Sequence, residues 1–369
     1  MDLGSPVTTE LRKQSSPKGS ATHDTFRTGK GQGGLPPGGE PMITLHTSTG
    51  EARELHAAGF EPRPQTLDPA IVWIDMLQPN KAEDALVEGL LGISVPTRED
   101  LKDIEPSSRL YTENGAVFMT ASLLCGVDRE RPALTDVAFV LAQNRVVTVR
   151  YDDPRAFTLF KAALKRSPDG CGTGIGLLLR LLETITDRTA EILEHAALKL
   201  DDLSHRVFET PAGSRRRDPH YLEERLREVA AQHRLVALAR DSLSSLDRLL
   251  TFLYTVPDTQ AETEMKELSR TLSRDVQTLS EHATFISGNI AFLLDASLGL
   301  INVEQNAIIK IFSIASVVFL PPTLVASLYG MNFRFMPELD WTFGYPFAIL
   351  LMIVSAIIPY LFFRWKGWL

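Results

Sequence analysis

Two long runs of uncharged, apolar residues near the C-terminus constrain this chain more than any other feature of its sequence. The second run, Trp341–Phe363, has 23 residues without a charge, and the first, Ile311–Leu328, has 18. A helix needs about 20 apolar residues to cross the hydrocarbon core of a bilayer. Both runs are therefore predicted to be transmembrane helices, joined by the short polar segment between them.

The charges that flank these runs predict the orientation of the chain. The tail Arg364–Leu369 is basic and aromatic, which favours the cytoplasmic side of a membrane. The loop between the runs carries one arginine, Arg334, against Glu338 and Asp340, which favours the outer side. The first forty residues contain no apolar signal-peptide core, so we expect both termini in the cytoplasm. The expected protein spans a membrane twice and has most of its chain in the cytoplasm.

Composition excludes several function classes. The chain has 369 residues and a net charge of −8, which argues against a nucleic-acid partner. Its two cysteines, Cys125 and Cys171, lack the spacing of a zinc site or a redox pair. We find no paired catalytic carboxylates, nucleophile motif or phosphate-binding loop, so the chain is not expected to be an enzyme. A formal GxGxxG match lies within residues 29–34, but proline follows it instead of a helix, so it is read as a linker.

Upstream of the apolar runs the sequence predicts an α+β domain followed by long helices. Strand-like runs such as Ile71–Ile74 alternate with turn signals at Asn114-Gly115 and Gln143-Asn144. Long helical segments are expected near Ile175–Phe208 and Pro219–Tyr254, and a third from about Thr259 onward. The predicted domain organisation is a disordered extension (1–41), a cytoplasmic α+β domain (42–166), a helical domain and stalk (167–305), a first transmembrane helix (306–332), an outer loop (333–340), a second transmembrane helix (341–363) and a basic tail (364–369).

The third long helix carries an apolar seam with alternating steps of three and four. Its members are Val276, Leu279, Ala283, Ile286, Ile290, Leu293, Ser297 and Leu300. Such a seam is typical of a coiled coil. It fits equally well a helix that packs on the other two helices of its own chain. Its continuation into a membrane segment favours contacts between subunits.

The first apolar run also carries a polar stripe. Ser316, Leu320, Thr323 and Ser327 follow steps of four, three and four, so three of these four positions are hydroxyls. Lipid offers such a face no hydrogen bonds, and it should therefore meet other helices or water. Helix packing through small residues explains the stripe alone somewhat better than a pore does.

Several ordered motifs together resemble the CorA family of magnesium channels. They are Tyr329-Gly330-Met331-Asn332-Phe333, Phe335-Met336-Pro337-Glu338-Leu339, Gly344-Tyr345-Pro346, the terminal Lys366-Gly367-Trp368-Leu369, and the stretches VWIDMLQP, SSRLYTENGAVFMT and VVTVRYDDPR. The resemblance extends from about Ile71 to the last residue. It implies a funnel-shaped homopentamer in the lipid bilayer that carries hydrated Mg²⁺, and also Co²⁺ and Ni²⁺, down the electrochemical gradient.

The resemblance also implies which residues line the pore. The selectivity filter is expected at Gly330, Met331 and Asn332, where a ring of amide oxygens would bind the water shell of the ion. Thr323 would add a second polar ring, and Phe312 and Leu320 would form apolar constrictions. The pore-lining set carried over or read from the stripe is Asn306, Phe312, Ser316, Leu320, Thr323 and Ser327.

Intracellular Mg²⁺ is implied as a regulatory ligand as well as a substrate. The matching residues are Asp295 on the stalk and Asp100 in the α+β domain of a neighbouring subunit. Taken without the resemblance, Asp295 reads as a solvated helix residue and Asp100 as a helix N-terminal residue, capped together with Thr97.

One residue departs from the family pattern. Arg334, two positions after Asn332, stands where relatives usually have an acidic residue, which lowers the negative charge at the outer mouth. Glu338 and Asp340 in the same loop are expected to compensate.

Two alternatives remain beside a magnesium channel. A zinc transporter similar to ZntB would share the fold, but FMPEL is the magnesium-type loop and no soft ligand lines the helix. A membrane-anchored scaffold protein with an inert helical anchor would need neither the hydroxyl stripe nor the GMN motif.

Overall fold

The computed structural model describes residues 42–55, 67–102, 105, 109–129, 131–168, 171–208, 219–257, 259, 263–332, 336–337 and 341–368. The predicted N-terminal extension, residues 1–41, lies outside this set. The elements are β1 (Met42–Thr47), β2 (Ala52–Leu55), β3 (Ile71–Leu77), α1 (Lys81–Leu91), η1 (Asp100–Lys102), β4 (Leu110–Glu113), β5 (Ala116–Cys125), η2 (Val127–Arg129), β6 (Ala133–Ala142), β7 (Arg145–Arg150), α3 (Arg155–Arg166), α4 (Gly174–Phe208), α5 (Pro219–Leu253), α7 (Thr263–Tyr329) and α8 (Gly344–Trp365).

The strands form one mixed sheet in the order β2-β1-β3-β7-β6-β5-β4. Among the strands that the structure describes, only β3 and β7 pair in parallel, and the other neighbours are antiparallel. Two hairpins turn through two residues each, at Asn114-Gly115 and Gln143-Asn144, all four with positive φ. Paired positive φ angles give the tight turn whose twist matches that of the strands. Both predicted turns are confirmed.

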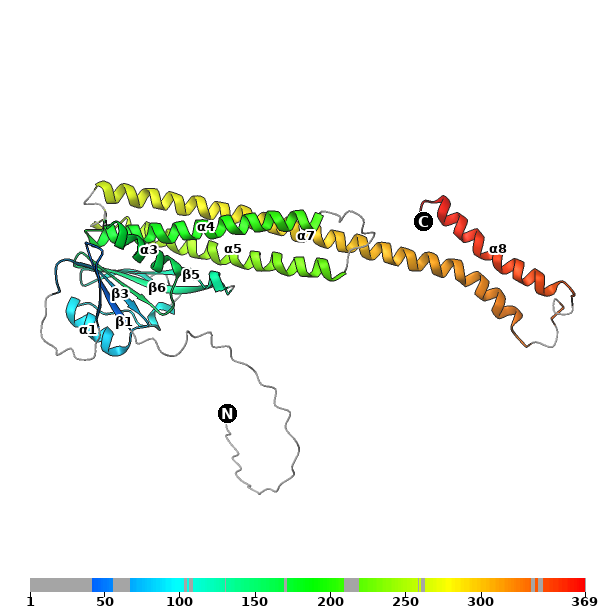
Figure 1. Ribbon diagram of the computed structural model, residues 1–369, viewed down its shortest axis with the longest axis horizontal. Helices are drawn as coiled ribbons and strands as arrows, with labels where there is room; N and C mark the ends of the chain where they lie inside the picture. Colours follow the sequence, from blue (N-terminus) through cyan, green and yellow to red (C-terminus); the bar gives the residue numbers. More distant parts are fainter. Residues whose placement is uncertain are drawn as a thin grey trace, which may run out of the picture. The chain divides into compact units, whose positions relative to one another are not determined.

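Side chains alternate between the two faces of the sheet, as strand geometry requires. On β5, Val117, Met119 and Ala121 belong to the core shared with α3, α4 and α5, whereas Phe118 belongs to the core shared with α1. Figure 1 shows α1 on one side of the sheet and α3 on the other. The α+β domain therefore has three layers, with an apolar core on each side of the sheet.

The helix that was predicted to begin near Asp100 is shorter than expected. Thr97 donates its backbone N–H and its hydroxyl to Asp100 Oδ2, both at 2.8 Å, so the expected capping contact is present. The turn that follows is only the three-residue 3₁₀ helix η1. A second N-terminus, at α1, has a complete capping box between Asn80 and Glu83.

The long helices α4, α5 and α7 pack against one another, and the apolar seam of α7 lies inside this packing. Val276, Ala283 and Ile290 are fully buried within the single chain and belong to its main core. The interpretation of this seam as a contact between subunits is therefore wrong. Its partners are α4 and α5 of the same chain.

The last two helices carry the apolar runs. α7 is one continuous helix of 67 residues, about 100 Å long, and it crosses the predicted boundary at 305–306 without a break. Its most apolar 18-residue window is 6% buried, and that of α8 is 11% buried. A core helix of a soluble protein would be mostly buried. Length, hydropathy and exposure thus make both helices candidates for crossing a membrane.

Candidate functional site

A shallow, open groove lies along the exposed face of α7 within its apolar part. Its walls are Ser316, Phe319, Leu320, Thr323, Leu324 and Ser327. Four of these six residues are the stripe read from the sequence. Phe319 and Leu324 were missed, because a helical groove is wider than a single line of steps of three and four.

Two hydroxyls in this groove, those of Ser316 and Thr323, are oriented by the helix itself. Ser316 Oγ donates to the carbonyl of Phe312 at 2.9 Å, and Thr323 Oγ1 donates to the carbonyl of Phe319 at 2.8 Å. Because each hydroxyl hydrogen is used within the helix, the lone pairs of the oxygen remain to accept hydrogen bonds. An oxygen that only accepts suits the water shell of a cation.

The two predicted apolar constrictions lie in the groove and on its stalk side. Leu320 in the groove and Phe312 before it are both largely exposed in the single chain, and Asn306, six residues before Phe312, is also exposed. Large exposed apolar side chains on one face need a partner surface, which lipid or other helices supply.

The helix ends where the predicted selectivity filter begins. Gly330 donates its N–H to the carbonyl of Ala326 at 2.9 Å, and a Cβ at Gly330 would lie 3.0 Å from that oxygen. A side chain at this position would therefore be crowded against the Ala326 carbonyl. Met331 and Asn332 follow it and are exposed. The predicted loop residues Glu338 and Asp340, and Arg334, lie outside the described residues.

The two predicted regulatory carboxylates lie on separate elements of the chain. Asp100 is exposed on η1. Asp295 is exposed on α7, two residues from the buried seam residues Leu293 and Ser297 and therefore on the opposite side of the helix. Carboxylate oxygens are ligands that Mg²⁺ accepts. The pairing was predicted between subunits, so within one chain it stays a prediction.

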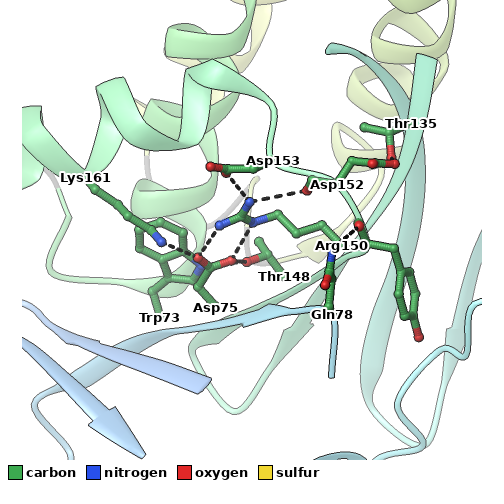
Figure 2. Close-up of polar contacts among 10 residues, drawn as sticks. Trp73, Asp75, Gln78, Thr135, Thr148, Arg150, Asp152, Asp153 and Lys161 are labelled. Atoms are coloured by element: carbon green, nitrogen blue, oxygen red, sulfur yellow. Dashed lines mark hydrogen bonds and ion pairs between the residues drawn. The ribbon is translucent and has the colours of Figure 1, made fainter. Parts of the chain in front are cut away.

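A buried charge network connects the sheet to α3 and was not found by the sequence analysis (Figure 2). Asp75 on β3 accepts from Arg150 Nε at 3.0 Å, from Arg150 Nη2 at 2.8 Å and from Thr148 Oγ1 at 2.8 Å. Lys161 Nζ of α3 lies 2.6 Å from the same carboxylate. Asp153 forms a further ion pair with Arg150.

This network stabilises the negative charge of the buried Asp75 carboxylate. Burial raises the pKa of Asp75, but the charges and hydrogen bonds of Arg150 and Lys161 together outweigh it. The pKa of this carboxyl is therefore well below its usual range, and Asp75 is ionised. The two cations and two anions balance, which makes the network a structural link between β3, β7 and α3.

His46 lies next to this network without entering it. Its ring stacks on Trp73 with centroids 4.3 Å apart, and Trp73 Nε1 donates to Thr148 at 2.9 Å. His46 Nε2 is buried without a hydrogen-bond partner. Burial lowers the pKa of His46 from 6.5 to about 4, with nearby Asp75 opposing this and Lys161 adding to it. The folded chain therefore holds His46 neutral.

Acidification should consequently weaken the fold through His46. The unfolded chain binds a proton near pH 6.5 and the folded chain only near pH 4, so this contribution to stability is complete above pH 6.5 and is lost as the pH falls toward 4. Between pH 7 and pH 5 the free energy of unfolding should fall by about 2 kcal/mol more in the wild type than in His46→Phe, which keeps the stacking on Trp73. Denaturant unfolding of both proteins in detergent measures the difference. Equal pH dependence in the two would contradict this role.

The comparisons with known proteins agree with one another. The family model described as "CorA-like Mg2+ transporter protein" matches residues 68–365. Proteins named magnesium transport protein CorA are 37% identical over 298 residues in Escherichia coli K12 and over 300 residues in Pectobacterium atrosepticum, in each case covering 81% of this chain and 92% of the relative.

Solved structures share the fold. The complete CorA structure from Methanocaldococcus jannaschii matches with a TM-score of 0.68 at 21% identity, over 89% of this chain and 98% of that chain. The ZntB cytoplasmic domain from Vibrio parahaemolyticus matches with a TM-score of 0.51 at 12% identity, over 71% of this chain and 98% of that chain. Because the family model covers most of the chain and the CorA relatives exceed a third in identity, this chain belongs to the family of CorA-like Mg²⁺ transporter proteins.

Proposed function

We propose that this protein transports Mg²⁺ across a membrane through a pore lined by α7. The observation that carries the proposal is the groove of acceptor hydroxyls at Ser316 and Thr323, on the last turns of α7 before Asn332. Mg²⁺ gives up its water reluctantly. Neutral oxygens can bind the hydrated ion loosely enough for it to leave again. The relatives named magnesium transport proteins support the same substrate.

A pore requires several copies of the groove, because one open groove cannot enclose an ion. A second stripe on α7 supplies a surface for them. Phe285 and Phe292 are largely exposed, and Gly288 and Gly299 have open space above their Cα atoms. These four positions follow steps of three, four and seven, the spacing of a helix–helix seam. We infer that this stripe, and not the buried one, meets neighbouring subunits in a homopentamer with the funnel shape that the family resemblance implies.

The membrane topology follows from the flanking charges. α7 and α8 would cross the bacterial inner membrane, with both termini in the cytoplasm. Arg364 and Lys366 lie at the end of α8, where basic residues favour the cytoplasmic face. Trp341 lies at the other end of the pair, before α8 begins, as interfacial aromatic residues do.

Mg²⁺ in the cytoplasm would also act as a regulatory ligand between Asp295 of one subunit and Asp100 of the next. Both carboxylates are exposed in the single chain, so each is free to face a neighbour. Bound Mg²⁺ would hold the two together. Its loss would leave like charges opposed and let the subunits separate.

Ion flux into vesicles that contain the purified protein tests both the transport and its regulation. Mg²⁺ should enter, Co²⁺ and Ni²⁺ should compete, and hexamminecobalt, whose ligands do not exchange, should block. Absence of Mg²⁺ flux would overturn the function.

The same vesicles test the regulation. Mg²⁺ on the cytoplasmic face should reduce the flux. Asp295→Lys should raise the Mg²⁺ concentration needed for half-inhibition about fivefold, which corresponds to about 1 kcal/mol. An unchanged concentration would exclude Asp295 from the regulation.

The zinc alternative makes a different prediction in the same vesicles. The match to the ZntB cytoplasmic domain supports a common fold only. The described residues contain no group of three or more histidine, cysteine or acidic side chains that could hold a metal. Zinc flux that needs a proton gradient, together with no Mg²⁺ flux, would favour the zinc transporter.

A further inference from the structure

The end of α8 forms a specific turn that fixes the direction of the tail. Gly367, with φ of +68°, donates its N–H to the carbonyl of Arg364 at 3.1 Å, and Trp368 donates to the carbonyl of Phe363 at 3.0 Å. These two bonds define the Schellman motif, which reverses the chain at a helix C-terminus through a left-handed residue. The apolar contact that accompanies the motif is also present, because the rings of Trp368 and Phe363 stack with centroids 5.6 Å apart.

This turn brings Trp368 onto the other membrane-spanning candidate. Lys310 Nζ of α7 lies 5.4 Å from the centroid of the Trp368 ring, within the range of a cation–π contact. Lys310 is half-buried and directly precedes the uncharged run of α7. Ile314, one helical turn further on, is the buried residue of this part of α7, so both share the face toward α8.

Of the two tryptophans near the C-terminus, Trp368 and not Trp365 makes the contact with Lys310. Trp365, three residues earlier, is 81% exposed, whereas Trp368 is 48% exposed. Phe363, on which Trp368 rests, is one of the two buried residues of α8. An ammonium at the edge of an apolar run gains from an aromatic face, because that face replaces part of its lost hydration.

We propose that Trp368, held by the Gly367 turn, is a clasp that binds Lys310. This contact fixes α7 to α8 at the start of the apolar run of α7. Trp368 and Lys310 are positioning residues and do not touch the ion. The clasp fixes the position of α7 near Asn306 and Phe312, which lie four residues before and two residues after Lys310. Its effect on transport rests on the proposed function, whereas the clasp itself does not.

Carboxypeptidase digestion of the full-length protein in detergent tests the clasp without transport. The enzyme removes residues from the C-terminus, and intact mass reports the release of Trp368. Release follows the fraction of tails that are undocked. Lys310→Met should accelerate it roughly three- to tenfold, and Lys310→Arg, which keeps the cation, should not. Trp365→Ala is the matched control and should leave the rate unchanged. Equal release from the wild type and Lys310→Met would overturn the clasp.

Mg²⁺ influx into vesicles then tests the positioning role. Lys310→Met and Trp368→Ala should change the influx rate in the same direction and by a similar factor, and the double variant should change it no further. Trp368→Phe, which keeps a ring, should restore most of the wild-type rate. Additive effects, or a normal rate in Trp368→Ala, would overturn the positioning role. Absence of influx in the wild type would instead overturn the proposed function, and the digestion result would stand by itself.

Discussion

Replacing Asn332 with alanine is expected to reduce Mg²⁺ uptake by at least about tenfold. Asn332 is exposed three residues beyond the end of α7 and carries the amide oxygen proposed to bind the hydrated ion. A hydrogen bond to a charged partner contributes about 1.5–3 kcal/mol, and every subunit of an oligomer would lose one. Growth of a magnesium-auxotrophic cell and influx into vesicles both measure the change.

The matched control for this prediction lies on α8, outside the groove and the predicted filter. Ile358 is 62% exposed, and Ile358→Leu keeps an apolar side chain of equal volume, so uptake should remain close to that of the wild type. Asn332→Ala should leave the unfolding transition unchanged, because the side chain is not part of a core. Uptake within twofold of the wild type would remove Asn332 from the selectivity filter.

Patterns within single elements predicted most of the fold. Tight turns at Asn114-Gly115 and Gln143-Asn144 could be read from two residues each, and the long helices from their period and from proline boundaries. The seam of α7 shows the limit of this reading. A row such as Val276, Ala283 and Ile290 states that one face is buried, but not whether its partner belongs to the same chain. The structure decides this, because α4 and α5 already cover the row.

The candidate site was predictable where it lies on one helix. The step pattern of Ser316, Thr323 and Ser327 could be read directly, because residues three and four apart share a face. The orientation of their hydroxyls could not, since it depends on a choice between the helix carbonyls and outside partners. The tail contact between Lys310 and Trp368 also escaped the sequence, because 58 positions separate them and only packing of α7 on α8 brings them together.

The charge network around Asp75 could not be predicted either, because its members are also far apart in the sequence. Asp75 and Arg150 are 75 residues apart, and they meet because β3 and β7 pair in parallel. On a central strand the alternation of side chains places Trp73 and Asp75 on the same face, toward α3. A charged residue within an apolar strand such as IVWIDML is a signal that a buried partner exists, although it does not identify the partner.

Asp75→Ala is expected to destabilise the α+β domain by about 3–5 kcal/mol. Asp75 and Arg150 are each about 1% exposed, so the substitution leaves a buried guanidinium without its main partner, and removes the partner of Lys161 as well. Uncompensated buried charges cost about this much. Denaturant unfolding of the full-length protein in detergent, followed by the near-ultraviolet signal of buried Trp73, measures the loss.

Asp153→Ala is the control for this prediction, because it removes an exposed carboxylate near Arg150 instead of the buried one. Asp153 also forms an ion pair with Arg150, but its side chain is 44% exposed, and water can replace it. Its removal should cost no more than about 1 kcal/mol. Asp75→Asn should fall between the two variants, since the amide oxygen still accepts one hydrogen bond while the charge is lost. A loss for Asp75→Ala no larger than that for Asp153→Ala would show that the domain does not depend on the buried pair, and packing of Trp73 and Phe157 would then have to hold β3 against α3.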